Sequence, residues 1–386
     1  MMSEAAKRSL LQICPNDHPP FKDLCRYYAA AAKSIGWSVT TLFLGSPRED
    51  PLEHARYLNA TDLRRTAVLA RALQDSLQES LQNEAGSTPG GAQPTIALCH
   101  RYRAYRVLMA SDLSVSTVVT VAHEFGFFAR RQRRLAVRTR RLTGGRRLIF
   151  AGVSDAVQRE LQAVDPHAVL LPNGIDLNRA DRQRLGRAEA RAFFGLTDDT
   201  FCVGVVGRLH PKKSPALALE GFRLAARAMP GAHLIFIGSG ELAASLQRAA
   251  RDLPVTFAGF VPEAARYFSG LDLLVLPSSS KEAFGMVALE AMAAELPVLS
   301  SPAPGPSYVL GTQGDYFQPA TPSMLAQALS SAYERWQVAG GASADRTTAD
   351  SKSAAKAARE RVAALFSVEA AAQRLQQLAD SVCADQ

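Results

Sequence analysis

The sequence predicts an α/β protein built from two successive doubly wound parallel sheets. Three observations predict this class. Short apolar runs alternate with helical stretches, the pattern pauses near residues 172–195 and then restarts, and 386 residues suit about two domains. We therefore expect two Rossmann-like domains, at residues 1–172 and 173–365. A closing helix is expected at 366–386. The sequence does not decide which domain this helix packs on, and the N-terminal domain is one option.

In the first half, each expected strand is a short run of β-branched and other apolar residues. The strands are expected at 9–14, 38–43, 95–99, 117–122, 148–153 and 168–171. The helices between them are expected at 22–35, 61–84, 101–110 and 155–163. A stretch rich in Gly, Ser, Pro and Asn at 83–94 predicts a loop.

The second half repeats the alternation. Its strands are expected at 200–207, 232–238, 255–258, 271–277 and 297–300, and its helices at 215–228, 241–252, 262–269 and 285–294. The Ala, Ser, Thr and Gly-rich stretch at 339–354 predicts a flexible loop.

Composition excludes several classes of protein. At 47% hydrophobic residues the chain is too apolar to be largely disordered, and no apolar run reaches the roughly 18–20 residues that span a bilayer. We see no signal peptide at the N-terminus and expect a cytoplasmic protein. The cysteines are odd in number and have no close pairs, which disfavours zinc clusters and disulfide frameworks; they are Cys14, Cys25, Cys99, Cys202 and Cys383.

The net charge of +8 comes from one segment. Nine arginines and no acidic residue lie between Arg130 and Arg147, interleaved with Leu135, Val137 and Leu142. A solvated cationic helix is the usual meaning of such a run. Nucleic-acid binding is less favoured because no recognised nucleic-acid module accompanies it.

The segment 277–292, PSSSKEAFGMVALEAM, is the most informative for function. A strand ends, a short loop follows, and a helix begins with Gly285, so the helix N-terminus offers an anion site beyond the end of a parallel strand. Glu282 and Glu290 lie about 12 Å apart along such a helix, near the span from the sugar to the ribose of a nucleotide sugar. An acidic first turn that complements the helix dipole explains these residues equally well.

Two further segments carry glycines or cations between a strand and a helix. In GVVGRLHPKKS, at 204–214, Arg208 and Lys213 follow Gly207 in a loop that suits a diphosphate. A solvated basic turn is the ordinary alternative. IGSGELA, at 237–243, matches a dinucleotide-binding fingerprint but lacks the acidic residue after the next strand, and tight strand–helix packing explains its glycines as well.

Together and in this order, these segments resemble the second domain of family 4 glycosyltransferases, which have the GT-B fold of two Rossmann-like domains facing across a cleft. The family's E-x7-E element matches Glu282 to Glu290, and its GRL-x3-K element matches 207–213. VSDAVQREL at 153–161 and LPNGIDL at 171–177 also resemble family segments. As a whole, the sequence resembles bacterial enzymes that build lipopolysaccharide core or other surface polysaccharides.

The resemblance implies a nucleotide-sugar donor, with UDP favoured, held mostly by the second domain. Glu290 would bind the ribose hydroxyls and Glu282 the donor sugar, while Arg208 and Lys213 would hold the diphosphate beside Gly207. The backbone amides of Phe284, Gly285, Met286 and Val287 would complete the phosphate cradle. The loop that contains Val261 would sit by the base.

The resemblance also implies a role for the first half. His123 matches the family histidine that faces the donor sugar, although a lone histidine is ordinarily a structural residue; His100 is a weaker candidate. Asp17 and His18, in a first loop that departs from the family's glycine-rich turn, are candidates for acceptor contact. Family enzymes retain anomeric configuration and usually need no metal or other cofactor, and this chain lacks an Asp-x-Asp motif.

The resemblance gives the basic segment a further interpretation, because GT-B enzymes bind acceptors in the N-terminal half. Arg130–Arg147 would then contact an anionic membrane surface or a phosphorylated glycolipid. Two other functions stay open: a nucleotide-sugar epimerase, which shares the two-domain layout but not the E-x7-E and GRL-x3-K elements, and a non-catalytic binder of nucleotide sugars.

Overall fold

A computed structural model describes residues 8–48, 50–60, 62, 65–84, 96–143, 146–341 and 349–383. The chain divides into two compact units, which are Met1–Ile175 with Phe366–Gln386 (the N-terminal unit) and Asp176–Leu365 (the C-terminal unit). The loop predicted at 83–94 lies outside the described residues from 85 onward. Within the described ranges, no helix has the length and apolar character to cross a membrane.

The N-terminal unit is built on a parallel sheet with the order β3-β2-β1-β4-β5-β6-β7. The strands are β1 Ser9–Cys14, β2 Ser38–Phe43, β3 Ala55–Tyr57, β4 Ile96–His100, β5 Thr117–Ala122, β6 Arg147–Gly152 and β7 Val169–Leu170. Strand order reverses between β1 and β4, and parallel sheets of this kind bind ligands beyond the carboxyl ends of the strands at that reversal.

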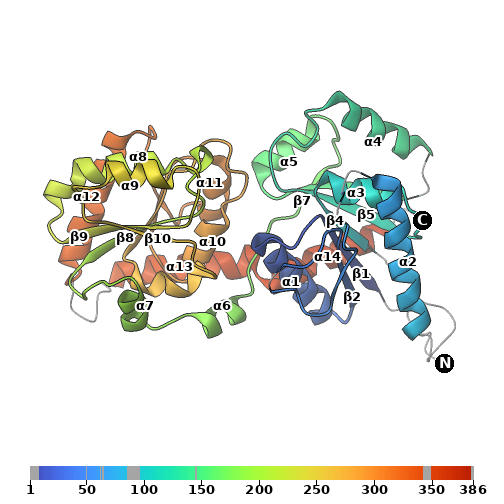
Figure 1. The fold of residues 1–386 in the computed structure, drawn as a ribbon, viewed down its shortest axis with the longest axis horizontal. Coiled ribbons are helices and arrows are strands. Elements are labelled where there is room, and N and C mark those ends of the chain that lie inside the picture. Colours follow the sequence, from blue (N-terminus) through green and yellow to red (C-terminus); the bar gives the residue numbers. More distant parts are fainter. Residues whose placement is uncertain are drawn as a thin grey trace. The chain divides into compact units, whose positions relative to one another are not determined.

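Helices cover both faces of this sheet (Figure 1). They are α1 Pro19–Ser34, α2 Thr66–Glu84, α3 Arg101–Met109, α4 Arg131–Thr143, α5 Asp155–Gln162 and α14 Val368–Cys383. The closing helix α14 packs beside α1, and the Tyr27 hydroxyl donates to the Ser367 carbonyl at 3.0 Å. The end of the chain therefore completes the N-terminal unit.

The C-terminal unit repeats the topology with the order β10-β9-β8-β11-β12-β13. Its strands are β8 Phe201–Val206, β9 Ala232–Ile237, β10 Val255–Gly259, β11 Leu273–Leu276, β12 Val298–Ser300 and β13 Asp315–Tyr316. Its α-helices are α6 Leu177–Gln183, α7 Arg187–Phe193, α8 Pro215–Ala225, α9 Ala243–Ala249, α10 Met286–Ala293, α11 Pro304–Leu310, α12 Pro322–Val338 and α13 Ala349–Phe366. Both predicted α/β halves are confirmed as parallel, doubly wound sheets.

The core of the C-terminal unit lies between the sheet and α8 and α12. Phe222 and Phe236 are fully buried there, and Leu325 of α12 packs on α8 at Gly221. A Cβ at Gly221 would lie 2.6 Å from Leu325 Cδ2, so the glycine permits the two helices to approach closely. This packing fixes β8 and the loop that follows it.

Several sequence predictions differ from the structure. The predicted helix at 262–269 is a 3-10 helix, Ala264–Gly270, and the predicted helix at 22–35 begins earlier, at Pro19, because proline suits the first helical turn. In the predicted loop at 339–354, residues 342–348 lie outside the described part, but α13 already begins at Ala349. The joining segment 172–195 contains the helices α6 and α7.

Helix α7 is anchored by a buried ion-pair network that the sequence does not reveal. Arg191 is 1% exposed, and its guanidinium lies 3.3 Å from Asp272 and donates to the Gly270 carbonyl at 3.1 Å. Arg187 pairs with the other oxygen of Asp272 at 2.8 Å. The Asp272 carboxylate thus links α7 to the segment just before β11. The two arginines neutralise it, since a buried charge must be paired.

Candidate functional site

The candidate site in the C-terminal unit lies where strand order reverses, between β8 and β11. The loop after β8 contains Gly207 and Lys213, and the loop after β11 contains Glu282 and Gly285. The Ser279 amide donates to the Lys212 carbonyl at 3.0 Å and joins the two loops. Two segments about 70 residues apart in sequence therefore form one surface at the carboxyl edge of the sheet.

Glycines permit the close backbone approaches that shape this edge. Gly207 and Gly238 have φ values of +133° and +145°, and a Cβ at Gly238 would lie 2.0 Å from the Gly207 carbonyl oxygen. A Cβ at Gly240 would lie 2.4 Å from the Leu209 carbonyl oxygen. The glycines of IGSGELA therefore bring the loop after β9 against the loop after β8, and close packing accounts for them.

Lys213 and Glu282 form an ion pair across the two loops. Lys213 Nζ lies 3.0 Å from Glu282 Oε2, and their side chains are 26% and 11% exposed. Partial burial strengthens this attraction relative to a surface pair, so each side chain holds the other in place. Arg208 lies in the same loop, is exposed, and makes no ion pair with any residue in the part of the chain that the structure describes.

The N-terminus of α10 faces the end of the sheet from the second loop. Gly285 precedes the helix with φ +93°, a conformation that favours glycine, while Phe284 is buried. The first amides of a helix, here at Met286 and Val287, have no acceptor within it and carry the positive end of the helix dipole. This arrangement suits an anion. Glu290 lies half-buried one turn further along α10.

Gly305, which is not among the residues predicted from the sequence, fixes the position of Glu282. The Gly305 amide at the start of α11 donates to the Glu282 carbonyl at 3.0 Å. A Cβ at Gly305 would lie 2.2 Å from the Phe284 nitrogen, so no other residue fits without moving the loop. A glycine between two prolines, in SPAPGPS, was the available signal.

Val261, predicted to lie near a base, follows β10 and is buried. Its loop is tied to the site through Gly259, whose carbonyl accepts from the Gly238 amide at 2.7 Å. The structure thus brings Gly207, Lys213 and Glu282 together directly. Val261 lies further along the same sheet edge, beyond β9.

In the N-terminal unit, the two candidate histidines lie together. His100 ends β4 and is fully buried, while His123 follows β5 and is half-buried. His100 Nδ1 lies 3.1 Å from His123 Nε2. Burial lowers the pKa of His100 to about 3. Burial lowers the pKa of His123 as well, and the neighbouring His100 and the positive charge of Arg101 lower it further. Both rings are therefore neutral near pH 7.

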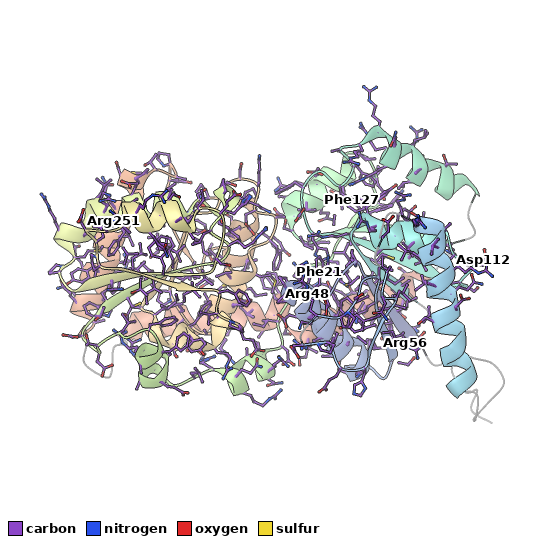
Figure 2. The ribbon with its side chains drawn as sticks, in the orientation of Figure 1. Phe21, Arg48, Arg56, Asp112, Phe127 and Arg251 are labelled. Carbon is purple, nitrogen blue, oxygen red and sulfur yellow. The ribbon has the colours of Figure 1, made fainter. Side chains whose placement is uncertain are left out.

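The first loop of this unit uses Asp17 internally. Asp17 is 1% exposed, and its carboxylate accepts from the Arg48 amide at 3.0 Å and from the Tyr57 hydroxyl at 3.4 Å. Asp17 therefore holds the segment that precedes β3. Arg48 belongs to this segment and is labelled in Figure 2. His18 is exposed, and its Nε2 lies 3.2 Å from Arg48 Nη2. His18 is therefore better placed than Asp17 for contact with another molecule.

The basic segment is not a uniform cationic surface. Arg133 donates to the Phe127 carbonyl at 2.9 Å and stacks 4.7 Å above the Tyr102 ring. Arg146 donates to the Leu108 carbonyl at 3.1 Å, and Arg147 donates to the Ser381 carbonyl. The side chains of Arg140 and Arg141 lie outside the described part. On the outer face of α4 and just before it, the side chains of Arg130, Arg131, Leu135 and Arg138 are exposed.

The part of the chain that contains the C-terminal site is similar to known proteins. Residues 200–335 match the family model described as glycosyl transferases group 1. A D-inositol 3-phosphate glycosyltransferase of Segniliparus rotundus is 34% identical over 151 residues, which are 36% of this chain and 33% of that protein. The match thus spans about a third of the length of this curated relative.

Two solved structures share the fold over nearly the whole chain. HepE of Anabaena, solved with UDP and glucose, has 17% identity and a TM-score of 0.71, covering 97% of this chain and 100% of its own. WaaG, a glycosyltransferase involved in lipopolysaccharide biosynthesis, has 18% identity and a TM-score of 0.62, covering 97% and 99%. Residues 200–335 of the C-terminal unit are therefore similar to the group 1 glycosyltransferase model, and the chain shares its fold with solved glycosyltransferases.

Proposed function

We propose that the chain is a retaining glycosyltransferase that moves a sugar from a nucleoside-diphosphate sugar, with UDP favoured, to a glycolipid or polysaccharide acceptor such as lipopolysaccharide core. The observation that carries the proposal is the site at the strand-order reversal of the C-terminal unit. There the Lys213–Glu282 pair, the exposed Arg208 and the N-terminus of α10 meet beyond a parallel sheet. The UDP and glucose in HepE support this choice of donor.

The site supplies positive charge where a diphosphate would leave. Arg208 and Lys213 bind the phosphate oxygens, and the amides at Phe284–Val287 add the dipole of α10. Glu282, held by Lys213, accepts hydrogen bonds from the donor sugar's hydroxyls. Glu290 accepts from the ribose hydroxyls, and the loop at Val261 contacts the base.

Transfer takes place on one face of the sugar through an oxocarbenium-like state. The bond from C1 to the diphosphate oxygen breaks, the acceptor oxygen forms the new bond on the same face, and the leaving phosphate takes the acceptor proton. The protein stabilises the negative charge that develops on the diphosphate. His123, neutral because of its burial, hydrogen-bonds the donor sugar, and none of these steps assigns a role to a metal ion.

The acceptor side is assigned to the N-terminal unit. The exposed residues Arg130, Arg131 and Arg138, with Leu135 between them, present cations and an apolar side chain together. Such a surface suits an anionic membrane or a phosphorylated glycolipid. The involvement of WaaG in lipopolysaccharide biosynthesis supports this class of acceptor.

Thermal unfolding with UDP, GDP, ADP, CMP and NAD tests the donor site. One nucleoside diphosphate at roughly 100 times its Kd should stabilise the wild type by about 2.7 kcal/mol. Glu290→Ala should lose that stabilisation, while Glu334→Ala, an exposed carboxylate on α12, should keep it. Stabilisation by NAD alone, or an unchanged response in Glu290→Ala, would contradict the proposal.

A further inference from the structure

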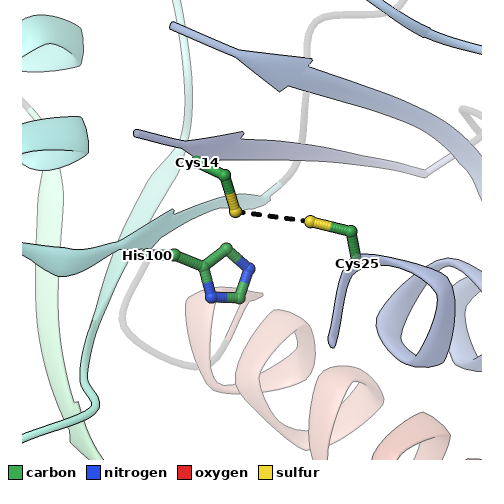
Figure 3. A group of neighbouring side chains, drawn as sticks. All are labelled: Cys14, Cys25 and His100. Atoms are coloured by element: carbon green, nitrogen blue, oxygen red, sulfur yellow. Dashed lines mark hydrogen bonds between the residues drawn. The ribbon is translucent and has the colours of Figure 1, made fainter. Parts of the chain in front are cut away.

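Three potential metal ligands meet at the strand-order reversal of the N-terminal unit. Cys14 ends β1, Cys25 lies in α1 and His100 ends β4, and their side chains converge in Figure 3. All three residues are fully buried. The two sulfurs lie 3.3 Å apart, and the ligand atoms of the three residues all lie within 4.8 Å of one another.

One atom of this group has no partner. His100 Nε2 is buried and makes no hydrogen bond to any described residue, whereas Nδ1 of the same ring lies 3.1 Å from His123 Nε2. Buried polar atoms are normally hydrogen-bonded, so the unpartnered nitrogen calls for an explanation. When Nδ1 donates its proton to His123, the lone pair of Nε2 is free to bind a cation.

The donor set indicates the class of cation. Thiolates and imidazole are soft or borderline ligands, which select Zn²⁺ or Cu⁺ over Mg²⁺ or Ca²⁺. Two thiolates and a neutral imidazole around Zn²⁺ form a group with no net charge, while the same ligands around Cu⁺ leave one negative charge. Because a buried net charge is unfavourable, the site favours the divalent ion.

We propose that Cys14, Cys25 and His100 bind Zn²⁺ in the N-terminal unit. Binding replaces the two thiol protons, which pass to solvent, so the two S–H bonds are exchanged for two S–Zn bonds without a change of oxidation state. His123 accepts the Nδ1 hydrogen of His100 and orients the ligating ring, the usual arrangement around a metal-bound histidine. The site therefore lies directly behind the histidine assigned to the donor sugar.

The sequence alone disfavours a zinc site because no two cysteines are closely spaced. Cys14 and Cys25 are separated by 11 positions and His100 by a further 75. The parallel pairing of β1 with β4 and the packing of α1 on that sheet bring the three together. The spacing was uninformative because the ligands come from three different elements.

Cobalt substitution tests the ligand set on the full chain. Protein reduced and stripped with a chelator should bind one equivalent of Co²⁺, with near-ultraviolet thiolate-to-cobalt absorption and intense visible bands that indicate low coordination. Zn²⁺ should abolish both signals. A cobalt complex without the thiolate absorption would overturn the proposal, and so would the absence of binding by either ion.

Variants separate ligation from a general effect of altered cysteine or histidine. Cys25→Ala and His100→Gln should lose retention of zinc, measured by elemental analysis after dialysis, and His123→Ala should weaken it about 10–100-fold. Cys202→Ala is the matched control, because Cys202 is equally buried but belongs to the C-terminal unit. Zinc retention in Cys25→Ala equal to that of Cys202→Ala would contradict the assignment.

The nearest alternative is an oxidised Cys14–Cys25 pair, since the sulfurs are already neighbours. Mass measurement without reductant distinguishes the two states, because a disulfide lowers the mass by two hydrogens and blocks metal binding. A disulfide in freshly purified protein that persists when zinc is supplied during expression would overturn the zinc proposal. Nucleotide stabilisation, assigned to the C-terminal unit, is measured separately, so failure of either proposal is visible without the other.

Discussion

The two units place different chemistry at the same topological position. In each sheet the strand order reverses beside the first strand of the unit, between β1 and β4 in one and between β8 and β11 in the other. In the C-terminal unit the loops there carry Arg208 and the paired Lys213 and Glu282. In the N-terminal unit, buried thiols and an imidazole of His100 occupy it. The fold therefore provides the position, and the side chains determine the ligand.

Burial accounts for most of this difference. Lys213 and the exposed Arg208 keep access to water and can exchange it for phosphate. Cys14, Cys25 and His100 have no exposed surface, so a charge there must be neutralised locally. One site suits a substrate that enters and leaves, and the other suits an ion that stays.

The largest expected effect comes from removing a cation at the C-terminal reversal. Arg208→Ala and Lys213→Ala should each lower turnover by roughly 10²–10³-fold, because each removes a preorganised group that stabilises the leaving diphosphate. The measurement is the initial rate of sugar transfer to an acceptor. Arg251→Ala is the control, an exposed arginine at the other side of the unit, labelled in Figure 2.

If both variants retained the turnover of Arg251→Ala, the comparison between the units would fail, because the C-terminal reversal would then have no distinct chemistry. If the variants lost rate but were still stabilised normally by the nucleotide, the cations would act in the transition state rather than in donor binding. The difference between the two units would then be one of catalysis.

How much was predictable differs between the two sites. Periodicity predicted the strands of both sheets, and in the N-terminal unit 9–14, 38–43 and 117–122 match β1, β2 and β5 residue for residue. The loops of the C-terminal site are each continuous in sequence, so their cations and glycines could be read directly. The contacts that position them, such as Gly305 on the Glu282 carbonyl, are tertiary and leave only weak local signals.

The N-terminal cluster could not be read from the sequence because its ligands come from three elements. Arg191 is a similar case, since nothing in its local sequence indicates that it pairs with Asp272 in the core. Arg133, Arg146 and Arg147 likewise counted toward a cationic surface, yet they bind carbonyls within the unit. Charge is read from sequence, but the partner of a charge is set by packing.

The next effect is steric and confined to the C-terminal unit. Gly305→Ala should destabilise the protein by about 1–3 kcal/mol, because its Cβ would lie 2.2 Å from the Phe284 nitrogen and must displace the loop that carries Glu282. Nucleotide stabilisation should fall as well. The free energy of unfolding is measured by denaturant titration with and without the nucleotide.

Gly186→Ala is the matched control in the same unit, since its added Cβ meets no atom within 4 Å. It should destabilise the protein by no more than about 1 kcal/mol, because Gly186 is the N-cap residue of α7, where alanine is less favourable than glycine. Equal effects of the two substitutions would show that the loop tolerates displacement, and the close contact at Gly305 would then not position Glu282.

The stability of the N-terminal unit should depend on pH through the buried His100. His100 has a pKa of about 3 in the folded protein and 6.5 when free. Between these pH values the unfolded chain binds a proton at His100 and the folded chain does not. Stability from this group is complete above pH 6.5 and is lost as the pH falls toward 3. Once the pH is well below 6.5, the loss should be about 1.4 kcal/mol per pH unit for each such histidine.

The measurement is the free energy of unfolding between pH 7 and pH 4, with a chelator present. His100→Gln should flatten the slope, because glutamine does not titrate in this range. His233→Gln provides the comparison, since His233 is only half-buried and its pKa is lowered less far from 6.5. A slope unchanged by His100→Gln would show that this ring is protonated in the folded protein.

The smallest effect belongs to the exposed part of the basic segment. Arg130→Gln, Arg131→Gln and Arg138→Gln should each weaken binding to anionic vesicles about fivefold, which corresponds to about 1 kcal/mol per charge near the surface. Sedimentation with vesicles containing phosphatidylglycerol measures the binding, and added salt should weaken it because the attraction is screened.

Arg146→Gln tests the division between exposed and internally bonded arginines in the segment, because Arg146 donates to the Leu108 and Ser111 carbonyls at 3.1 and 3.0 Å. It should cost stability and leave vesicle binding per folded molecule unchanged. If the wild type bound neutral vesicles as strongly as anionic ones, the proposed contact between these arginines and an anionic membrane would be wrong.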